Sequence, residues 1–151
     1  MVHSRINILQ SAPRKSSSAI GSELSVMAWI EDPFGKVLLV KQLAGRKAWT
    51  FPGGKVRSGE TLVAALKREI KEELSVNVQE ANLIDYFDRP EKPNVTFLFR
   101  VLLKPSGHLR LPKKEIEKYA YKATMPKRAT ASLIYFWGRA QKSFDPLSML
   151  T

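Results

Sequence analysis

The sequence contains no cysteine, few histidines and no long hydrophobic run. Without cysteine, disulfide bonds, thiolate nucleophiles and cysteine-ligated metal centres are excluded. The two histidines, His3 and His108, stand far apart in the chain, so we expect no histidine-based metal site and interpret both as surface residues. No apolar segment approaches the roughly 18 residues that a membrane-spanning helix requires, and we therefore expect no membrane partner.

Residues 1–22 lack acidic side chains altogether and contain six serines. This composition is typical of a flexible arm, and we assign residues 1–22 to one. Transit peptides are also acid-poor and serine-rich, but two arginines are thin support for that alternative, and we expect a cytoplasmic protein. Hydrophobic residues make up 44% of the 151-residue chain, enough for one core. We predict one domain over residues 23–142 and a C-terminal tail over residues 143–151.

One 23-residue run contains four of the 14 acidic residues. It extends from Gly54 to Val76 and reads GKVRSGETLVAALKREIKEELSV. On a helix, Glu69, Glu72 and Glu73 stand at i, i+3 and i+4, so their side chains share one face. A second, apolar stripe lies roughly 110° round the same helix and consists of Val63, Leu66, Ile70 and Leu74. The helix is therefore expected to pack through one face and to present carboxylates on the next.

Carboxylates this close together repel one another unless a cation lies between them. Hard cations such as Mg²⁺ prefer carboxylate oxygens and keep water ligands that substrate phosphates can displace. The acidic face therefore predicts a divalent metal site, with Arg68 donating to a neighbouring carboxylate and fixing its rotamer. Glu60 is expected in the first turn, where the helix dipole favours an anion. In the simpler alternative, the acidic face is solvated and Arg68 pairs with Glu72 at i, i+4.

The segment in front of this helix, from Trp49 to Val56, is a short apolar strand that runs into a Pro-Gly-Gly turn. Gly53 and Gly54 have no Cβ, so the backbone can approach a ligand or a metal closely there. A strand, a glycine turn and an acidic helix in this order form a more specific signal than any one of them alone.

The run from Gly54 to Val76 resembles the Nudix box, G-x5-E-x7-R-E-U-x-E-E-x-G-U, in which U is a bulky aliphatic residue. The positions in register are Gly54, Glu60, Arg68, Glu69, Ile70, Glu72, Glu73 and Val76. Ser75 is the one departure, where the family usually has glycine. Since a left-handed residue often follows a helix, this serine is expected to cost on the order of 1 kcal/mol unless the helix ends differently. The preceding W-x-x-P-G-G segment is similar to that of MutT-like members.

The resemblance implies hydrolysis of a nucleoside diphosphate linked to another moiety, by water attack on a phosphorus of the diphosphate. It places Mg²⁺ or Mn²⁺ on Glu69, Glu72, Glu73 and the carbonyl of Gly54. Arg68 would orient a glutamate, and Glu60 would support the loop or the metal shell. The general base of this family is either a box glutamate, here Glu69 or Glu72, or a residue of a later loop. Glu115 and Glu117 are the candidates in a later loop, and in the alternative both are surface charges.

The net charge is +11, although the box itself is acidic. Residues 33–59 contain six bases and no acid, and residues 100–142 contain eleven bases against two acids. An acidic metal site ringed by basic loops suits a polyanionic substrate, whose phosphates are steered inward and clamped. The candidate substrate-binding residues are Arg46, Lys47, Lys55, Arg57 and Arg89. In the alternative, the basic surface aids solubility or binds RNA without sequence preference.

The rest of the chain alternates strand-like segments with a second helix. Strands are predicted over residues 24–31, 36–42, 78–88 and 95–103, with a hairpin turn at residues 32–35. A packing helix is predicted over residues 126–141, with Pro126 in its first turn. Trp49 and Phe87 are expected in the core, although either could stack on a base. The resemblance implies an α/β/α sandwich with a mixed β-sheet between helices.

Two classes of function stay open. The first is an active Nudix pyrophosphohydrolase, which we favour because every charged position of the box is present. The second is a non-catalytic nucleic-acid-binding or regulatory module on the same fold. Candidate substrates are oxidised or ordinary nucleoside triphosphates, ADP-ribose or a nucleotide sugar, dinucleoside polyphosphates, inositol pyrophosphates and capped RNA ends. Small size and the tryptophan–proline entry favour nucleoside triphosphates or dinucleotides, whereas basicity favours highly phosphorylated substrates.

Overall fold

The computed structural model describes residues 23–45, 47–89, 91–105, 109–110 and 116–143. The predicted N-terminal arm and nearly all of the predicted C-terminal tail lie outside these ranges. The strands are β1 (Glu23–Trp29), β2 (Val37–Gln42), β3 (Trp49–Thr50), β4 (Gly53–Lys55), β5 (Val78–Arg89), β6 (Asn94–Leu103) and β7 (Ile116–Lys122). The helices are α2 (Leu62–Leu74) and α3 (Ala131–Ser143). Neither helix is long and apolar enough to cross a membrane.

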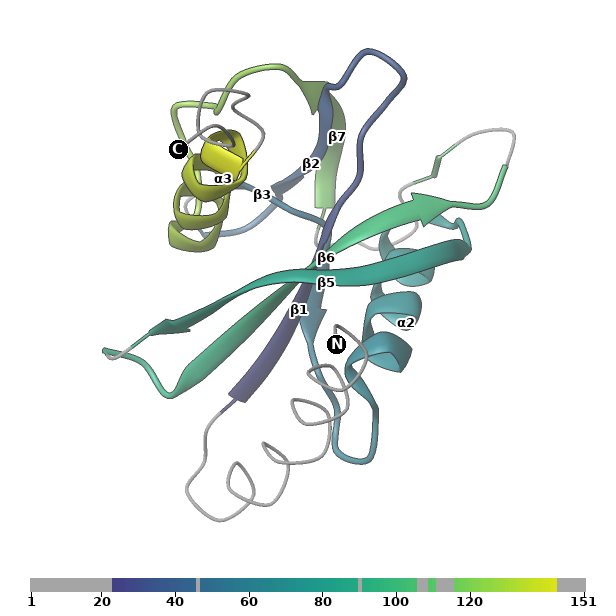
Figure 1. Cartoon of the computed structure of the whole chain (residues 1–151), viewed down its shortest axis with the longest axis vertical. Helices are drawn as coiled ribbons and strands as arrows, with labels where there is room; N and C mark the ends of the chain where they lie inside the picture. Colours follow the sequence, from purple (N-terminus) through teal and green to yellow (C-terminus); the bar gives the residue numbers. More distant parts are fainter. Residues whose placement is uncertain (1–22, 46, 90, 106–108, 111–115, 144–151) are drawn as a thin grey trace.

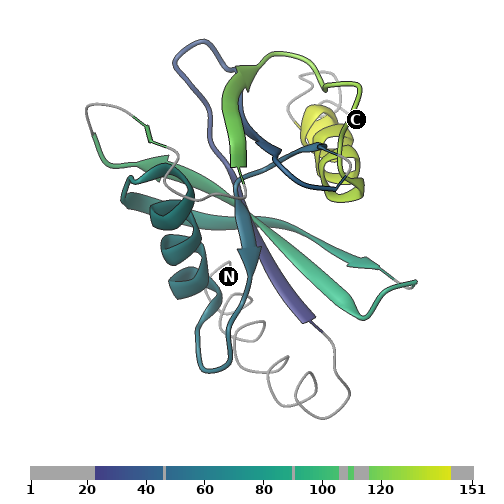
Figure 2. The ribbon, with the colours of Figure 1, turned by 180° about the vertical axis from the view of Figure 1, so that it is seen from behind.

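The strands form two sheets that lie between the two helices. The four-stranded sheet has the order β4-β1-β6-β5, and the three-stranded sheet has the order β3-β2-β7. The pairing of β1 with β6 is parallel, and the other strand pairs are antiparallel. Figures 1 and 2 show α2 and α3 on opposite sides of the strands. The predicted α/β/α sandwich with mixed β-structure is therefore confirmed.

The core consists of two hydrophobic clusters, one on each side of the strands. In β2, Leu38 and Val40 pack with α2, whereas Val37 and Leu39 pack with α3. This alternation explains why the run Val37–Val40 is apolar on both faces, since a strand between two helices buries both sets of side chains. Trp49 lies in the cluster around α3 and Phe87 packs against that cluster, as expected.

Helix α2 has a defined cap at each end. Thr61 is the N-cap, and its hydroxyl accepts a hydrogen bond of 3.0 Å from the backbone N–H of Ala64. Glu60 precedes this cap, so the expectation that it lies in the first turn is wrong. At the other end Ser75 is left-handed (φ 59°, ψ 33°), and its N–H donates to the carbonyl of Lys71 at 3.0 Å. The helix thus ends in the left-handed geometry that favours glycine.

Replacing Ser75 with glycine should stabilise the protein by about 0.5–1 kcal/mol, because glycine removes the Cβ strain of the left-handed conformation. Urea denaturation of the Ser75→Gly variant measures this gain. Asn77→Gly is the matched control, since Asn77 is exposed nearby and its φ is not positive. That variant should be neutral or less stable, and equal gains from both changes would contradict the strain argument.

The connection between β1 and β2 contains the predicted turn but also changes sheet. The turn at residues 32–35 forms, with the N–H of Gly35 donating to the carbonyl of Asp32 at 3.0 Å. However, β1 and β2 belong to different sheets, and beyond the turn they are linked only near Glu31 and Val37. The predicted hairpin turn is therefore present, closed by the antiparallel bridge of Glu31 with Val37, but the strands that it joins diverge into different sheets.

The second helix starts later than predicted. Residues 126–130 are not helical, and α3 begins at Ala131, where the hydroxyl of Thr130 accepts from the N–H of Leu133 at 3.3 Å. Pro126 therefore lies before the helix and not in its first turn. Strand β7 was not predicted, because its sequence IEKYAYK contains three charged residues and little apolar alternation.

Candidate active site

The acidic face of α2 lies against the glycine turn at β4. Glu69 and Glu73 are buried, with only 5% and 4% of their surface exposed. Glu73 accepts a hydrogen bond of 3.1 Å from the backbone N–H of Gly53. Buried carboxylates require such partners, since an uncompensated charge is costly away from water. The glycine turn thus fixes one of the carboxylates in place.

Arg68 connects the remaining acids of this helix and the loop before it. Its guanidinium donates twice to Glu60, from Nε at 2.7 Å and from Nη2 at 2.9 Å. Nη1 donates to Glu69 at 2.8 Å and, over a longer 3.4 Å, to Glu72. Nη2 also donates to the carbonyl of Lys55 at 2.9 Å. A planar fork with several fixed partners restricts the rotamers of the carboxylates around it.

The contact between Arg68 and Glu60 changes the titration of both groups. The hydrogen bonds from Arg68, helped by one from the N–H of Arg57, lower the pKa of Glu60 from 4.5 to about 2. The same contact raises the pKa of Arg68 above its ordinary value, mainly through Glu60 and then Glu69. Glu60 therefore stays ionised well below neutral pH and holds the loop of residues 57–60 against the helix.

This shift predicts a pH dependence of stability. The pKa of Glu60 is about 2 in the folded protein and close to 4.5 when unfolded, so the unfolded chain binds more protons between these values. The stabilisation is present above pH 4.5 and disappears as the pH falls toward 2. Between pH 7 and pH 3, the difference in unfolding free energy between wild type and Glu60→Gln should shrink by about 2 kcal/mol. Urea denaturation at the two pH values measures it, and a constant difference would contradict the assignment.

The two glycines of the turn are required by close packing. A Cβ on Gly54 would lie 2.5 Å from the Oε1 of Glu69, so glycine is what allows this carboxylate to rest on the backbone. Gly53 has φ +151°, and a Cβ there would overlap the carbonyl oxygen of Val26 on β1. The close contacts at this turn are thus made by the protein's own carboxylate and by a neighbouring strand, and the predicted approach to a ligand or a metal stays a prediction.

A cleft of about 830 Å³ opens beside these carboxylates. Its walls come from the glycine turn and α2 on one side, and from β2, the loop after β2 and the start of β7 on the other. The lining residues are Val40, Gln42, Ala44, Gly45, Thr50, Gly53, Gly54, Lys55, Arg57, Glu69, Glu73 and Ile116. The cleft thus combines buried acids, two bases and an apolar wall in one volume.

The predicted basic residues are distributed unevenly around this cleft. Lys55 and Arg57 line it, with Lys55 Nζ 3.2 Å from Glu23 and Arg57 Nη2 3.7 Å from Glu72. Lys47 is exposed and left-handed (φ 50°), and it is not among the lining residues.

Arg89 is not brought to the cleft either. It lies over the ring of Phe87 at 5.5 Å and contacts Glu91 at 3.2 Å. Arg46 and Glu115 lie outside the described residues. Of the other acids, Glu72 does not line the cleft, and Glu117 pairs with Lys41 at 4.0 Å.

Several residues that line the cleft were not predicted from the sequence. Gln42, Thr50 and Ile116 come from three different strands, and none of them carries a motif. Gln42 stands opposite Ile116 at a register shift in the β2–β7 pair, which brings two distant parts of the chain to one wall. Only a correct prediction of β7 and of its pairing could have found them.

The oxygen donors at the acidic end of the cleft are of the kind that bind a hard divalent cation. Glu69 and Glu73 offer buried oxygen donors beside the carbonyl-bearing glycine turn, and such donors are those that Mg²⁺ and Mn²⁺ prefer. Within the part of the chain that the structure describes, no three acidic or histidine side chains gather closely enough to hold an ion by themselves. The predicted set of Glu69, Glu72, Glu73 and Gly54 therefore stays a prediction.

Fold and site together define a class of α/β/α proteins in which one acidic helix borders a large, partly basic cleft. The family model of the NUDIX domain matches residues 21–137. The chain therefore belongs to the Nudix family and is a Nudix hydrolase, a pyrophosphatase. Members of this family generally use divalent metal ions.

Individual relatives agree with this assignment. The chain is 33% identical over 114 residues to an 8-oxo-dGTP diphosphatase of Haemophilus influenzae, covering 70% of this chain and 84% of that protein. It is 32% identical over 90 residues to a human protein named 8-oxo-dGDP phosphatase NUDT18, covering 58% of this chain and 27% of that protein. The crystal structure of a MutT NUDIX hydrolase from Burkholderia pseudomallei superposes with a TM-score of 0.68 at 25% identity, covering 76% of this chain and 94% of that one.

Proposed function

We propose that this enzyme hydrolyses oxidised purine nucleoside triphosphates such as 8-oxo-dGTP. The products are the nucleoside monophosphate and inorganic pyrophosphate. The observation that carries the proposal is the pair of buried carboxylates, Glu69 and Glu73, at one end of a cleft that also contains Lys55 and Arg57. The name of the Haemophilus influenzae relative supplies the triphosphate 8-oxo-dGTP, and the human relative, named for the diphosphate 8-oxo-dGDP, supports only the oxidised base.

The acidic end of the cleft would hold Mg²⁺ or Mn²⁺ through Glu69 and Glu73, with Glu72 and the carbonyl of Gly54 as further candidates. When bound, such a cation neutralises phosphate oxygens and lowers the pKa of a water molecule. The hydrogen bond from Arg68 holds the Glu69 carboxylate in one rotamer that faces the cleft. Substrate binding therefore does not have to order this side chain.

The basic side chains of the cleft would bind the phosphate chain. Lys55 ends β4 and Arg57 follows it on the loop before α2, and each has one acidic neighbour, Glu23 and Glu72 respectively. Both pairs are solvent-exposed and therefore weak, so a triphosphate can compete for the two cations. Arg57 would exchange a distant carboxylate contact for a bidentate contact with phosphate.

The opposite wall would receive the base. Val40 and Ile116 provide apolar surface, and Gln42 provides an amide with both a donor and an acceptor. Oxidation at C8 gives guanine a carbonyl acceptor and an N7–H donor. An amide can donate to the carbonyl and accept from the N7–H. In the ordinary base N7 is itself an acceptor, so the amide oxygen would be repelled there. Gln42 is therefore the side chain through which the oxidised base would be recognised.

A turnover panel tests the proposal. It compares 8-oxo-dGTP, dGTP, ADP-ribose, a dinucleoside polyphosphate, an inositol pyrophosphate and 5′-triphosphorylated RNA, each with Mg²⁺, Mn²⁺ or a chelator. We expect the highest kcat/KM for 8-oxo-dGTP, at least about tenfold above dGTP, since one buried hydrogen-bond pair discriminates by this amount or more. Activity should disappear with the chelator. Faster turnover of another compound class, or turnover that survives the chelator, would contradict the proposal.

A further inference from the structure

A second cluster of basic side chains lies on the face of the three-stranded sheet that is turned away from the cleft. Two of its ammonium groups lie over the indole of Trp49, and we call the cluster the Trp49 basic face. Its members are Lys41 on β2, Lys47 before β3, Lys118 and Lys122 on β7, and Arg128 after β7. None of these five side chains lines the cleft.

The strand register places the two sites on opposite sides. Lys41 is opposite Lys118, and Val37 is opposite Lys122, so these lysines share the face of β2 that packs on α3. The cleft residues Val40 and Gln42 belong to the alternate face, which packs toward α2. The Trp49 basic face therefore cannot clamp the phosphates of a nucleotide whose reacting end lies in the cleft.

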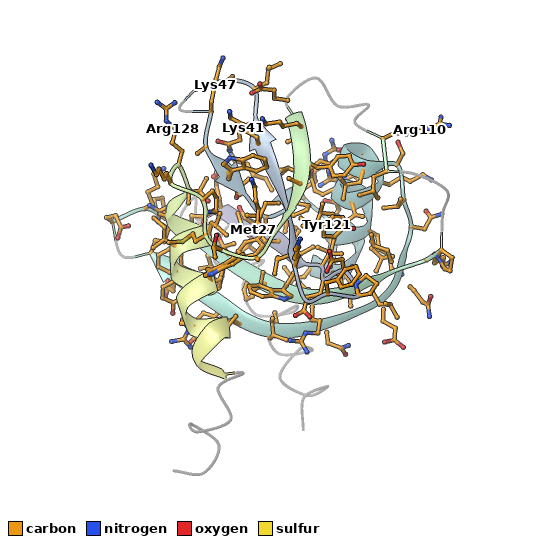
Figure 3. All side chains as sticks on the ribbon, turned by 90° about the horizontal axis from the view of Figure 1, so that it is seen from above. Met27, Lys41, Lys47, Arg110, Tyr121 and Arg128 are labelled. Atoms are coloured by element: carbon orange, nitrogen blue, oxygen red, sulfur yellow. The ribbon has the colours of Figure 1, made fainter. Side chains whose placement is uncertain are left out.

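Arg128 and Lys41 are held beside Trp49 through backbone contacts. The N–H of Trp49 donates to the carbonyl of Arg128 at 2.7 Å, and Trp49 pairs with Lys41. Figure 3 shows the side chains of Lys41, Lys47 and Arg128 at one end of the molecule, with Arg110 far to the other side. Segments far apart in the sequence thus contribute positive charge to one surface.

Little negative charge balances this surface. In the described ranges, the one carboxylate within salt-bridge distance of these five residues is Glu117, which is 4.0 Å from Lys41. The ammonium groups of Lys118 and Lys122 instead lie over the indole of Trp49, at 5.8 and 4.8 Å from the ring centroid. Cation–π contacts of this kind hold the two like charges together at the surface despite their repulsion.

The geometry fits an extended phosphate backbone better than a single phosphate or a base. The ammonium groups of Lys118 and Lys122 lie 5.8 and 4.8 Å from the same ring centroid, so they are at most roughly 11 Å apart and can contact nearby phosphates of one strand. Trp49 is only 9% exposed, so its ring is not available for stacking on a base. Four of the five cations are lysines, which contact phosphates as point charges and not through bidentate recognition.

We propose that the Trp49 basic face binds the sugar–phosphate backbone of single-stranded nucleic acid without sequence preference. This binding site is separate from the hydrolytic cleft and does not depend on the proposed substrate. If Lys41 stays with Glu117 and each of the other four cations neutralises one phosphate, the logarithm of the association constant should fall with the logarithm of salt concentration with a slope of about −3.

The test is fluorescence anisotropy with a 3′-labelled 12-nucleotide oligo(U) that has a 5′-hydroxyl end, repeated with oligo(dT). Both probes lack a phosphoanhydride, and a chelator is present, so the cleft has nothing to hydrolyse. The variant is Lys118→Gln/Lys122→Gln. The matched control is Lys67→Gln/Lys71→Gln, which removes the same charge from two exposed lysines at i, i+4 on α2.

We expect Lys118→Gln/Lys122→Gln to weaken binding of both probes by roughly 10- to 25-fold at 0.1 M salt and to reduce the slope by about 1.4. The control should change affinity by less than about threefold, because α2 lies on the other side of the strands. An unchanged thermal midpoint shows that the Lys118/Lys122 variant is folded.

Three results would overturn the proposal. The first is no binding by wild type at 0.05 M salt, and the second is an equal loss in the variant and the control, which would mean that net charge alone acts. The third concerns vesicles with 30% phosphatidylserine. If the variant loses binding to these vesicles but keeps binding to the oligonucleotides, the face binds lipid. None of these measurements uses turnover, so failure of the proposed hydrolytic function leaves them readable.

Discussion

Replacing Glu73 with glutamine should lower kcat by at least about 100-fold, because the change removes a charge from the acidic end of the cleft. The substitution is nearly isosteric. A glutamine oxygen can still accept the 3.1 Å hydrogen bond from the N–H of Gly53, so the glycine turn should keep its position. The expected loss is therefore one of charge, and not of fold.

Steady-state kinetics of Glu73→Gln with Mg²⁺ measures this effect, and Mn²⁺ binding followed by electron paramagnetic resonance reports the metal separately. We expect the affinity for Mn²⁺ to fall together with kcat. Glu80→Gln is the control, since Glu80 is an exposed acid on β5 outside the cleft. A variant with unchanged Mn²⁺ affinity and near-normal turnover would exclude Glu73 as a metal ligand and would leave Glu69 and Glu72 to be tested in the same way.

The acidic helix was predictable because its information is local. Spacings of three and four residues decide which side chains share a face, and Leu66, Ile70 and Leu74 are indeed fully buried while Glu69 and Glu73 point to the cleft. The glycine turn was predictable for the same reason, since a strand followed by two glycines permits few conformations.

The other half of the site depends on pairing between distant strands. Gln42 and Ile116 meet only because β7 pairs with β2, and the charged sequence of β7 does not alternate clearly enough to identify a strand. Lys41 and Lys118 converge through the same pairing. Short-range patterns do not specify such contacts, which are fixed by the packing of whole sheets.

The position of Glu60 shows a further limit of prediction from local sequence. Its place in the sequence suggested a contact with the helix dipole, but Thr61 takes the capping position and Glu60 contacts Arg68 instead. The side chain of an arginine eight residues away outweighs the dipole, because a bidentate charged contact is stronger than a partial charge at a helix end.

Replacing Gly53 with alanine should prevent stable folding or destabilise the protein by roughly 3–5 kcal/mol. A Cβ at this position would overlap the backbone carbonyl of Val26, and a strand backbone cannot move aside without breaking its pairing with β6. Because small domains are stable by only about 5–15 kcal/mol, low soluble yield is the first expected sign.

Gly54→Ala should behave differently, although the two glycines are neighbours. Its Cβ would meet the carboxylate of Glu69 at 2.5 Å, and that flexible side chain can rotate away at a cost of about 1–2 kcal/mol. Rotation also gives up the 2.8 Å contact with Arg68 and removes the carboxylate from the cleft, so kcat should fall by about 100-fold in a folded protein. Gly138→Ala on α3 is the control, since nothing lies within 4 Å of the added Cβ and alanine favours helix. Urea denaturation and kinetics on all three variants measure the two effects separately, and equal behaviour of Gly53→Ala and Gly54→Ala would contradict the distinction between a backbone and a side-chain obstacle.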